Sequence, residues 1–351
     1  MNEPVVRLAH VDVVFGQKPE LALPLMDAGR SREEIQAETG QIVGARDCSL
    51  DIHGGEIVVL MGLSGSGKST LLRTINGLNP VIRGSVEVFD GRRHIDVVHA
   101  DAGELRALRT RRIAMVFQQF ALLPWRTVAD NIGFGLELAG VKKAERRRRV
   151  ERQLALVNLG EWANAYVHEL SGGMQQRVGL ARAFATDAPI LLMDEPFSAL
   201  DPLIRAHLQD ELIDLQKKLG STIVFVSHDL DEALKIGSRI AIMEGGRIIQ
   251  VGTPQEIVLD PATPYVEDFV AHMNPLNVLR AVEVMTPAET APADDLPRAS
   301  PETPVRRLME MRLAARRPIV IEEDGKVVGI VDEDGLWRAL LRQDGDDRPA
   351  S

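Results

Sequence analysis

The 351-residue sequence contains one cysteine, 4% aromatic residues and no long apolar segment. Because Cys48 has no cysteine partner, the chain forms no internal disulfide, which suits a reducing compartment. No apolar run approaches the ~20 residues that a membrane-spanning helix needs. The first four residues lack the basic and apolar segments of a signal peptide. These absences predict a cytoplasmic protein without a membrane span of its own.

The sequence also lacks an excess of positive charge, since 51 acidic residues outnumber 41 basic ones and the net charge is −10. Such a balance argues against broad binding to nucleic acid or to anionic lipid. The basic run at 142–149 is a local exception, and a solvated helix face explains it more simply than a nucleic-acid site does. We therefore expect no nucleic-acid partner.

The strongest positive signal is a glycine-rich segment that directly follows the apolar run 57–61. It consists of Gly62, Leu63, Ser64, Gly65, Ser66, Gly67, Lys68, Ser69 and Thr70. A buried strand that leads into such a loop, with Lys-Ser at its end, is typical of a phosphate cradle for nucleotides. Its glycines allow the backbone N–H groups to point inward, and the helix that follows adds its positive dipole end. The sequence therefore predicts binding of a nucleoside triphosphate, with Lys68 on the β- and γ-phosphates and Ser69 on Mg²⁺.

Two adjacent carboxylates end a second apolar run, at 190–193. Asp194 is expected beside the phosphate loop, where it can hold Mg²⁺ through water. Neighbouring residues on a strand face opposite sides, so Glu195 points elsewhere and suits the base that polarises the attacking water.

Apolar runs that read as strands alternate with helical segments, which predicts a parallel sheet covered on both faces. Two segments interrupt this pattern. Residues 17–44 form a partly helical insertion to which the sequence assigns no role, and residues about 122–186 form a helical subdomain. Residues 286–304, rich in proline, alanine and acidic residues, are expected to be a linker. The segment 305–345 then forms a β–β–α unit that is too short to bury a core alone.

A further motif opens a helix after Leu170, and its residues are Ser171, Gly172, Gly173 and Gln175. Ser171 is a good N-cap, and the glycines permit an anion to approach the helix start. Alone this is an ordinary capped helix. Together with the phosphate loop and the paired carboxylates, it resembles the signature of the ABC-type ATPases, and all motifs appear in order over residues 5–277.

The resemblance implies an ATP- and Mg²⁺-dependent ATPase with a P-loop, RecA-like core over residues 1–285. By position, Gln118 resembles the glutamine that senses Mg²⁺ and nucleotide, and His228 the switch histidine on the γ-phosphate. Ser198 and Asp201 resemble the loop that crosses to the other subunit. Phe15 resembles the aromatic residue that stacks on adenine, although a plain core position is the alternative. The catalytic set is then Glu195, His228 and Gln118, and the metal set is Ser69, Gln118 and Asp194.

The chain has one phosphate loop and one signature. In this family the signature of one subunit completes the phosphate site of the other, so the resemblance implies a head-to-tail homodimer with two ATP molecules. It also implies a separate integral-membrane permease, docked by the loop 118–126 and the helical subdomain, with the ATPase peripheral at the cytoplasmic face of the membrane. A non-transport ABC ATPase and an efflux ATPase are the alternatives.

Within the family, the chain resembles the ATPase subunits of quaternary-amine importers, on residues 61–67, 119–124 and 197–205 and on the insertion. Residues 76–80, 124–126 and 271–277 look closer to the choline importer, so choline is the predicted substrate and glycine betaine or proline betaine the alternative. The few aromatic residues are scattered, whereas a quaternary-ammonium cage takes several. Selection therefore belongs to the permease and to a periplasmic or extracellular binding protein.

The C-terminal unit departs from the betaine pattern. Those ATPases can carry two CBS modules, and residues 305–342 resemble one at most. A single module that pairs with that of the other subunit and a remnant without a ligand both remain open.

Overall fold

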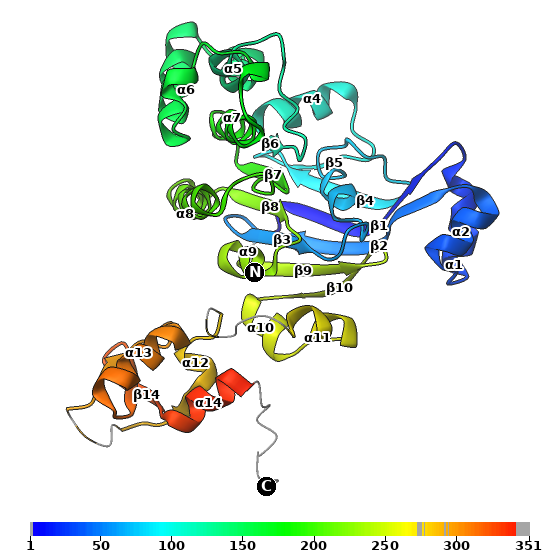
Figure 1. Cartoon of the computed structure of the whole chain (residues 1–351). Helices are drawn as coiled ribbons and strands as arrows, with labels where there is room; N and C mark the ends of the chain where they lie inside the picture. The colour runs from blue at the N-terminus through cyan, green and yellow to red at the C-terminus, as the bar shows by residue number, and fades with distance from the viewer. Residues whose placement is uncertain (1–2, 272–275, 277, 291–292, 294, 342–351) are drawn as a thin grey trace. The chain divides into compact units, whose positions relative to one another are not determined.

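The structure is a computed structural model that describes residues 3–271, 276, 278–290, 293 and 295–341 (Figure 1). The chain divides into two compact units. The first comprises Met1–Asp229 and Ile236–Val251, and the second comprises Leu230–Lys235 and Gly252–Ser351. The second unit thus begins well before residue 286, where the sequence placed the boundary of the ATPase domain.

A six-stranded sheet forms the centre of the first unit, in the order β10-β9-β3-β8-β7-β6. The strands are β3 (Ile57–Met61), β6 (Ile113–Val116), β7 (Ile190–Asp194), β8 (Thr222–Val226), β9 (Arg239–Glu244) and β10 (Arg247–Gly252). The strands from β9 to β6 in this order pair in parallel. Every residue of β3, β7 and β8 is buried, because helices cover both faces of such a sheet. The predicted parallel α/β core is therefore confirmed.

An antiparallel sheet packs beside it, in the order β2-β1-β4-β5. Its strands are β1 (Val6–Phe15), β2 (Ile42–Ile52), β4 (Arg83–Phe89) and β5 (His94–Asp96). One apolar cluster contains residues of both sheets and of helix α3 (Lys68–Leu72), which follows the phosphate loop. Helix α4 (Ala102–Arg111) leads from β5 to β6. The main core of this unit thus includes the strand that precedes the glycine-rich loop and the helix that follows it.

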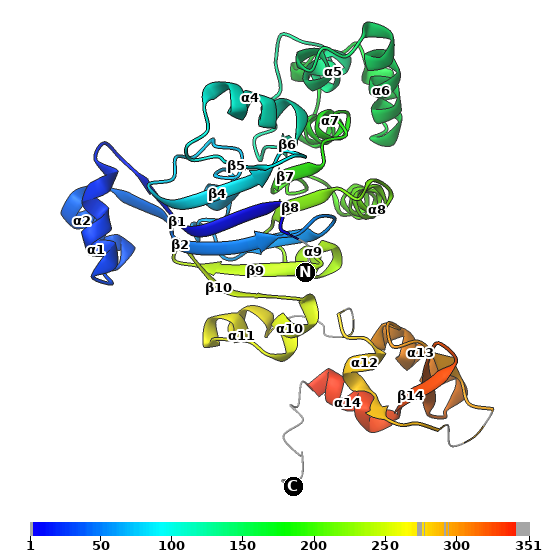
Figure 2. The same cartoon turned by 180° about the vertical axis from the view of Figure 1, so that it is seen from behind.

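The predicted insertion lies between β1 and β2, and Figure 2 shows it projecting from the ends of these strands. It contains a 3-10 helix (Pro19–Ala22), α1 (Leu23–Asp27) and α2 (Arg32–Thr39). A separate apolar cluster holds it together, consisting of Val14, Ala22, Met26, Ile35 and Val43. The insertion is therefore a folded element with its own small core.

The helical subdomain is formed by α5 (Val128–Leu138), α6 (Lys143–Leu156) and α7 (Gly172–Phe184), with 3-10 turns at Gly160–Trp162 and Val167–Glu169 (Figure 1). Helices α8 (Pro202–Leu219) and α9 (Leu230–Ile236) follow. In the basic run of α6, Arg147 pairs with Glu151, and Arg149 pairs with Glu145 and Asp187. These pairs agree with a solvated helix face.

The second unit contains a four-stranded sheet in the order β11-β14-β13-β12. Its elements are α10 (Pro254–Leu259), α11 (Pro264–Val270), α12 (Ala281–Val284), β11 (Thr286–Pro287), β12 (Arg298–Ala299), α13 (Val305–Ala315), β13 (Ile319–Glu323), β14 (Lys326–Val331) and α14 (Glu333–Leu341). The helices and the hairpin predicted after residue 305 are present.

The expectation that residues 286–304 form a linker is wrong, because this segment supplies both edge strands of the sheet. The segment after residue 305 does not bury its core alone: Leu279 and Ala281, which lie outside it, join residues of α13, β13, β14 and α14 in one cluster. Strands of two residues carry no alternating pattern, so the sequence could not reveal them. Residues 342–345 of the predicted half module lie outside the described residues, as do 272–275 and 277 of the segment that resembled the choline importer. Among the described helices, none is long and apolar enough to cross a membrane.

Candidate functional site: the phosphate loop and its neighbours

The phosphate loop connects β3 to α3, and its backbone has a shape that requires glycine. Gly62 and Gly67 have φ values of +144° and +101°. A Cβ on Gly62 would lie 2.1 Å from the carbonyl oxygen of Met243, and one on Gly67 would lie 2.4 Å from that of Gly44. Both contacts are with backbone, which cannot move aside easily. The loop is therefore wedged against β9 and β2 in a form that only glycine allows.

Lys68 begins α3 and is 6% exposed. Its Nζ donates to the carbonyl oxygens of Gly62 (2.8 Å) and Leu63 (2.9 Å). Burial lowers the pKa of Lys68, while the negative charges of Glu195 and Asp194 act in the opposite direction. The ammonium group is thus folded back onto the loop. The carboxylates of Asp194, at the end of β7, and of Glu195, directly after it, attract this positive charge.

Ser69 and Asp194 meet although they lie far apart in the sequence. Asp194 ends β7 and is fully buried. Its Oδ1 accepts from Ser69 Oγ at 2.6 Å, and its Oδ2 accepts from Arg73 Nη2 at 2.9 Å. Sequence reasoning found the first two residues and missed Arg73, which lies at the end of α3 in a segment without any motif.

Glu195, Gln118 and His228 converge on one carboxylate oxygen. Gln118 Nε2 and His228 Nδ1 each lie 3.3 Å from Glu195 Oε2. Glu195 has a φ of +48°, which is uncommon for a residue with a side chain. Its N–H donates to Val226, and its carbonyl accepts from Ser198 Oγ at 3.1 Å. The three residues with predicted catalytic roles are therefore neighbours, held by a strained backbone position of the kind found at functional sites.

The signature residues gather at the start of α7. Ser171 caps the helix by accepting from the N–H of Met174. Gln175 donates back to the carbonyls of Val167 and Leu170, at 3.1 Å each. The glycines are partly open, and a Cβ on Gly173 would come 3.5 Å from the carbonyl of Ala199.

Gln176, which sequence reasoning missed, joins this helix to the segment after Glu195. It is buried, donates to the carbonyl of Glu195 (3.4 Å), and accepts from the N–H of Ala199 (3.1 Å). Asp201 then caps α8 by accepting from Ile204. The only signal in the sequence was the position of this glutamine next to Gln175 of the signature.

Phe15 lies at the end of β1, where it packs against the main core. A Cβ on Gly44 would come 2.7 Å from its ring and 2.8 Å from the methyl of Thr70. The ring is therefore close to the end of the phosphate-loop motif, and it is half-buried. Stacking of Phe15 on adenine stays a prediction.

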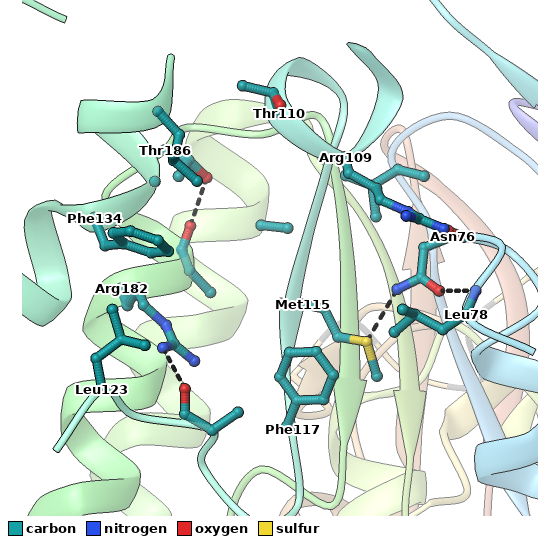
Figure 3. Close-up of a pocket in the computed structure, with 16 residues that line it drawn as sticks. Asn76, Leu78, Arg109, Thr110, Met115, Phe117, Leu123, Phe134, Arg182 and Thr186 are labelled. Carbon is teal, nitrogen blue, oxygen red and sulfur yellow. Dashed lines mark hydrogen bonds between the residues drawn. The ribbon is translucent and has the colours of Figure 1, made fainter. Parts of the chain in front are cut away.

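A pocket of about 340 Å³ lies between β6 and the helical subdomain (Figure 3). The loop after Gln118 forms part of its wall. Phe120 and Ala121 have positive φ values, and Arg182 of α7 donates to both of their carbonyls at 2.8 Å. Asn131 of α5 is fully buried and bonds the N–H and the carbonyl of Leu123. Two helices of the subdomain thus fix the course of this loop.

Comparisons with known proteins agree with this geometry. A family model described as ABC transporter matches residues 45–198. The glycine betaine/proline betaine transport system ATP-binding protein ProV of Escherichia coli is 47% identical over 95% of this chain and 82% of its own length. The chain belongs to the ABC transporter ATPases. The trimethylamine N-oxide transport system ATP-binding protein of Ruegeria pomeroyi is 42% identical over 97% of the chain and 98% of its own length.

A solved ATP-binding cassette, described as a dimer in a post-hydrolysis state with ADP and Pi, matches with a TM-score of 0.60 and 31% identity. It covers 71% of this chain and 98% of its own. The P-loop fold and the ATP-hydrolysing activity expected from the sequence are therefore confirmed.

Proposed function

We propose that this ATPase powers the import of small quaternary amines, with glycine betaine or proline betaine as the transported compound. The observation that carries the proposal is the 47% identity to an ATP-binding protein of a glycine betaine/proline betaine system, which extends over 95% of the chain. The relatives thus favour the betaines over choline, the substrate that the sequence suggested first. The ATPase would lie at the cytoplasmic face of the membrane.

Within the site, we assign Glu195 as the base that polarises the attacking water, with Gln118 and His228 orienting its carboxylate. Their approach to one oxygen of Glu195 supports this assignment. Lys68 would bind the β- and γ-phosphates. The oxygen donors of Ser69 and Asp194, with that of Gln118, suit Mg²⁺, which prefers oxygen ligands. When bound, Mg²⁺ neutralises charge on the phosphate oxygens.

The working unit is proposed to be a homodimer. Two solved cassettes at 31% identity are described as dimeric. In such an arrangement, Ser171, Gly172, Gly173 and Gln175 of one subunit would face the phosphate loop of the other. Ser198 and Asp201 would lie at the same interface, since Gln176 ties their loop to the signature helix.

A permease of the same transport system would dock on the pocket shown in Figure 3. The pocket is lined mainly by apolar side chains, and Trp125 in the adjoining loop is 71% exposed. Because the loop leads directly back to Gln118, a permease segment seated there would act on the nucleotide site through backbone already fixed by Arg182 and Asn131. A periplasmic or extracellular amine-binding protein would deliver the substrate to the permease.

Uptake by a strain that lacks this gene tests the proposal. Labelled glycine betaine, proline betaine, choline and trimethylamine N-oxide would be supplied separately, with the intact gene returned as the control. We expect betaine uptake to disappear and to return with the gene. Unchanged betaine uptake would refute the substrate assignment. Loss of trimethylamine N-oxide uptake alone would favour the second candidate, which the near full-length match to the Ruegeria pomeroyi protein supports.

A further inference from the structure

The helical insertion reaches the phosphate loop through one arginine. Arg32 is the first residue of α2, and its Nη1 donates to the carbonyl oxygen of Gly65 at 2.8 Å. We propose that Arg32 is a positioning residue of the phosphate loop, through which the insertion strengthens ATP binding. This proposal rests on the proposed role of that loop, and it gives the insertion a task that the sequence did not reveal.

A short chain of hydrogen bonds connects Arg32 to Lys68. The peptide group between Gly65 and Ser66 accepts from Arg32 at its oxygen, and at its nitrogen it donates to the carbonyl of Leu63 at 3.1 Å. The same carbonyl of Leu63 accepts from Lys68 Nζ at 2.9 Å. Because a peptide group is planar, holding both ends fixes its orientation. A cation on its oxygen also strengthens the bond made by its N–H.

Gly65 is a point of the loop where the backbone has freedom that such a contact can restrain. Its φ is +78°, and a Cβ placed there would meet no atom within 4 Å. No neighbouring atom blocks this side of the residue, and glycine has more backbone freedom to lose than any other residue. The hydrogen bonds of its peptide group provide the restraint, and Arg32 supplies one of them.

The backbone that carries Arg32 is itself well fixed. Ser31 and Glu34 form a capping box at the start of α2. Arg46 of β2 donates to the carbonyls of Arg30 (2.8 Å) and Met26, so the turn before α2 is tied to the strand. Together with the apolar cluster of the insertion, these contacts hold the start of α2 in place. The arginine can therefore position the loop rather than merely follow it.

Arg30 offers a matched control, because it lies two residues away and carries the same charge. Its side chain donates to Glu34 at 2.9 Å and is 50% exposed. Arg30→Ala and Arg32→Ala thus remove equal charge from the same turn, and only Arg32→Ala removes the contact with Gly65. Arg32→Met, which keeps the aliphatic stem, replaces the alanine variant if that variant fails to fold.

The experiment uses the full chain and a fluorescent ATP analogue, with hydrogen exchange measured over residues 62–68. Loss of a charged hydrogen bond to the loop predicts ATP affinity about 3- to 10-fold weaker in Arg32→Ala, with faster exchange at the Ser66 amide. Arg30→Ala should stay within about twofold of wild type, as expected for an exposed ion pair. If the two variants behave alike in both measurements, the proposal is refuted.

Lys68→Ala distinguishes a failure of the role proposed for Arg32 from a failure of the proposed ATP site itself. If Lys68→Ala binds the analogue as wild type does, the phosphate loop is not the ATP site and the proposed site itself fails. If Lys68→Ala loses binding while Arg32→Ala keeps normal affinity and normal exchange, only the role of Arg32 is wrong.

Discussion

Replacing Asn131 with leucine tests how the loop after Gln118 is held in place. The Asn131 side chain is fully buried and makes every hydrogen bond to backbone. Its Oδ1 accepts from the N–H of Leu123 at 2.8 Å. Its Nδ2 lies within reach of the carbonyls of Leu123 (3.1 Å), Arg126 (3.3 Å) and Thr127 (3.0 Å). The side-chain amide of Asn131 thus satisfies backbone groups of a loop that lies outside the regular helices and strands.

Leucine has a similar size, so the change chiefly removes hydrogen bonds rather than packing. A buried polar group left without a partner costs about 1–3 kcal/mol. Leu123 is only half-buried, so water can reach part of its backbone and the low end of that range applies. A loss of about 1–2 kcal/mol lowers the melting temperature of a unit of this size by roughly 2–8 °C.

Differential scanning calorimetry measures the shift in melting temperature, and hydrogen exchange over residues 118–127 shows whether the loop is released. Asp130→Asn is the matched control, because Asp130 is the exposed neighbour on the same helix, and surface changes of this kind stay within about 0.5 kcal/mol. A leucine variant that melts like wild type, with unchanged exchange in the loop, would show that Asn131 does not hold it.

Three further predictions concern single residues. Glu195→Gln should keep ATP binding and lower the hydrolysis rate by about 10²–10⁴-fold, as loss of a general base does; normal turnover would remove Glu195 from its assigned role. Gly62→Ala should abolish ATP binding through its clash with Met243. Gly65→Ala, whose added methyl group meets no atom, should weaken ATP binding only by the ~1–2 kcal/mol of strain in a left-handed alanine. Equal losses of ATP affinity for the two variants in nucleotide titrations would contradict this. Burial raises the pKa of Cys48 from 9.0 to about 11, so the native thiol should resist alkylation at neutral pH and react once unfolded. The protonated thiol's contribution to stability is complete below its ordinary pKa and is lost as the pH rises through its folded value.

Much of the site could be predicted because its motifs are local. A strand, a glycine loop and Lys68-Ser69 follow one another, so their spacing alone indicates the chemistry. The same holds for Asp194 and Glu195 at the end of a buried strand. The sheet could be predicted for a related reason, since apolar runs in a parallel sheet are continuous and easily recognised.

What the sequence could not show are contacts between distant segments. Arg32 and Gly65 lie in an insertion and a loop that no motif connects, and Arg73 resembles any arginine at a helix end. Gln176 joins α7 to the segment 195–199 only because α7 places it beside Glu195. The edge strands β11 and β12 are too short for an alternating pattern and contain or adjoin proline, so composition alone suggested a linker.

The polar groups of the nucleotide site are bonded to one another in this structure. Lys68 occupies the loop carbonyls, Asp194 is shared by Ser69 and Arg73, and Glu195 faces Gln118 and His228. If ATP binds as proposed, it exchanges these internal bonds for bonds to phosphate and Mg²⁺, and the net gain per exchanged bond is small, about 0.5–1.5 kcal/mol. Weakening a partner that occupies a side chain of the proposed Mg²⁺ and phosphate ligands, as Arg73 occupies Asp194, should then raise ATP affinity. Arg73→Lys provides this test, since lysine cannot reproduce the planar guanidinium contact with Asp194. A variant with weaker ATP binding than wild type would show that Arg73 supports the bound state and does not compete with it.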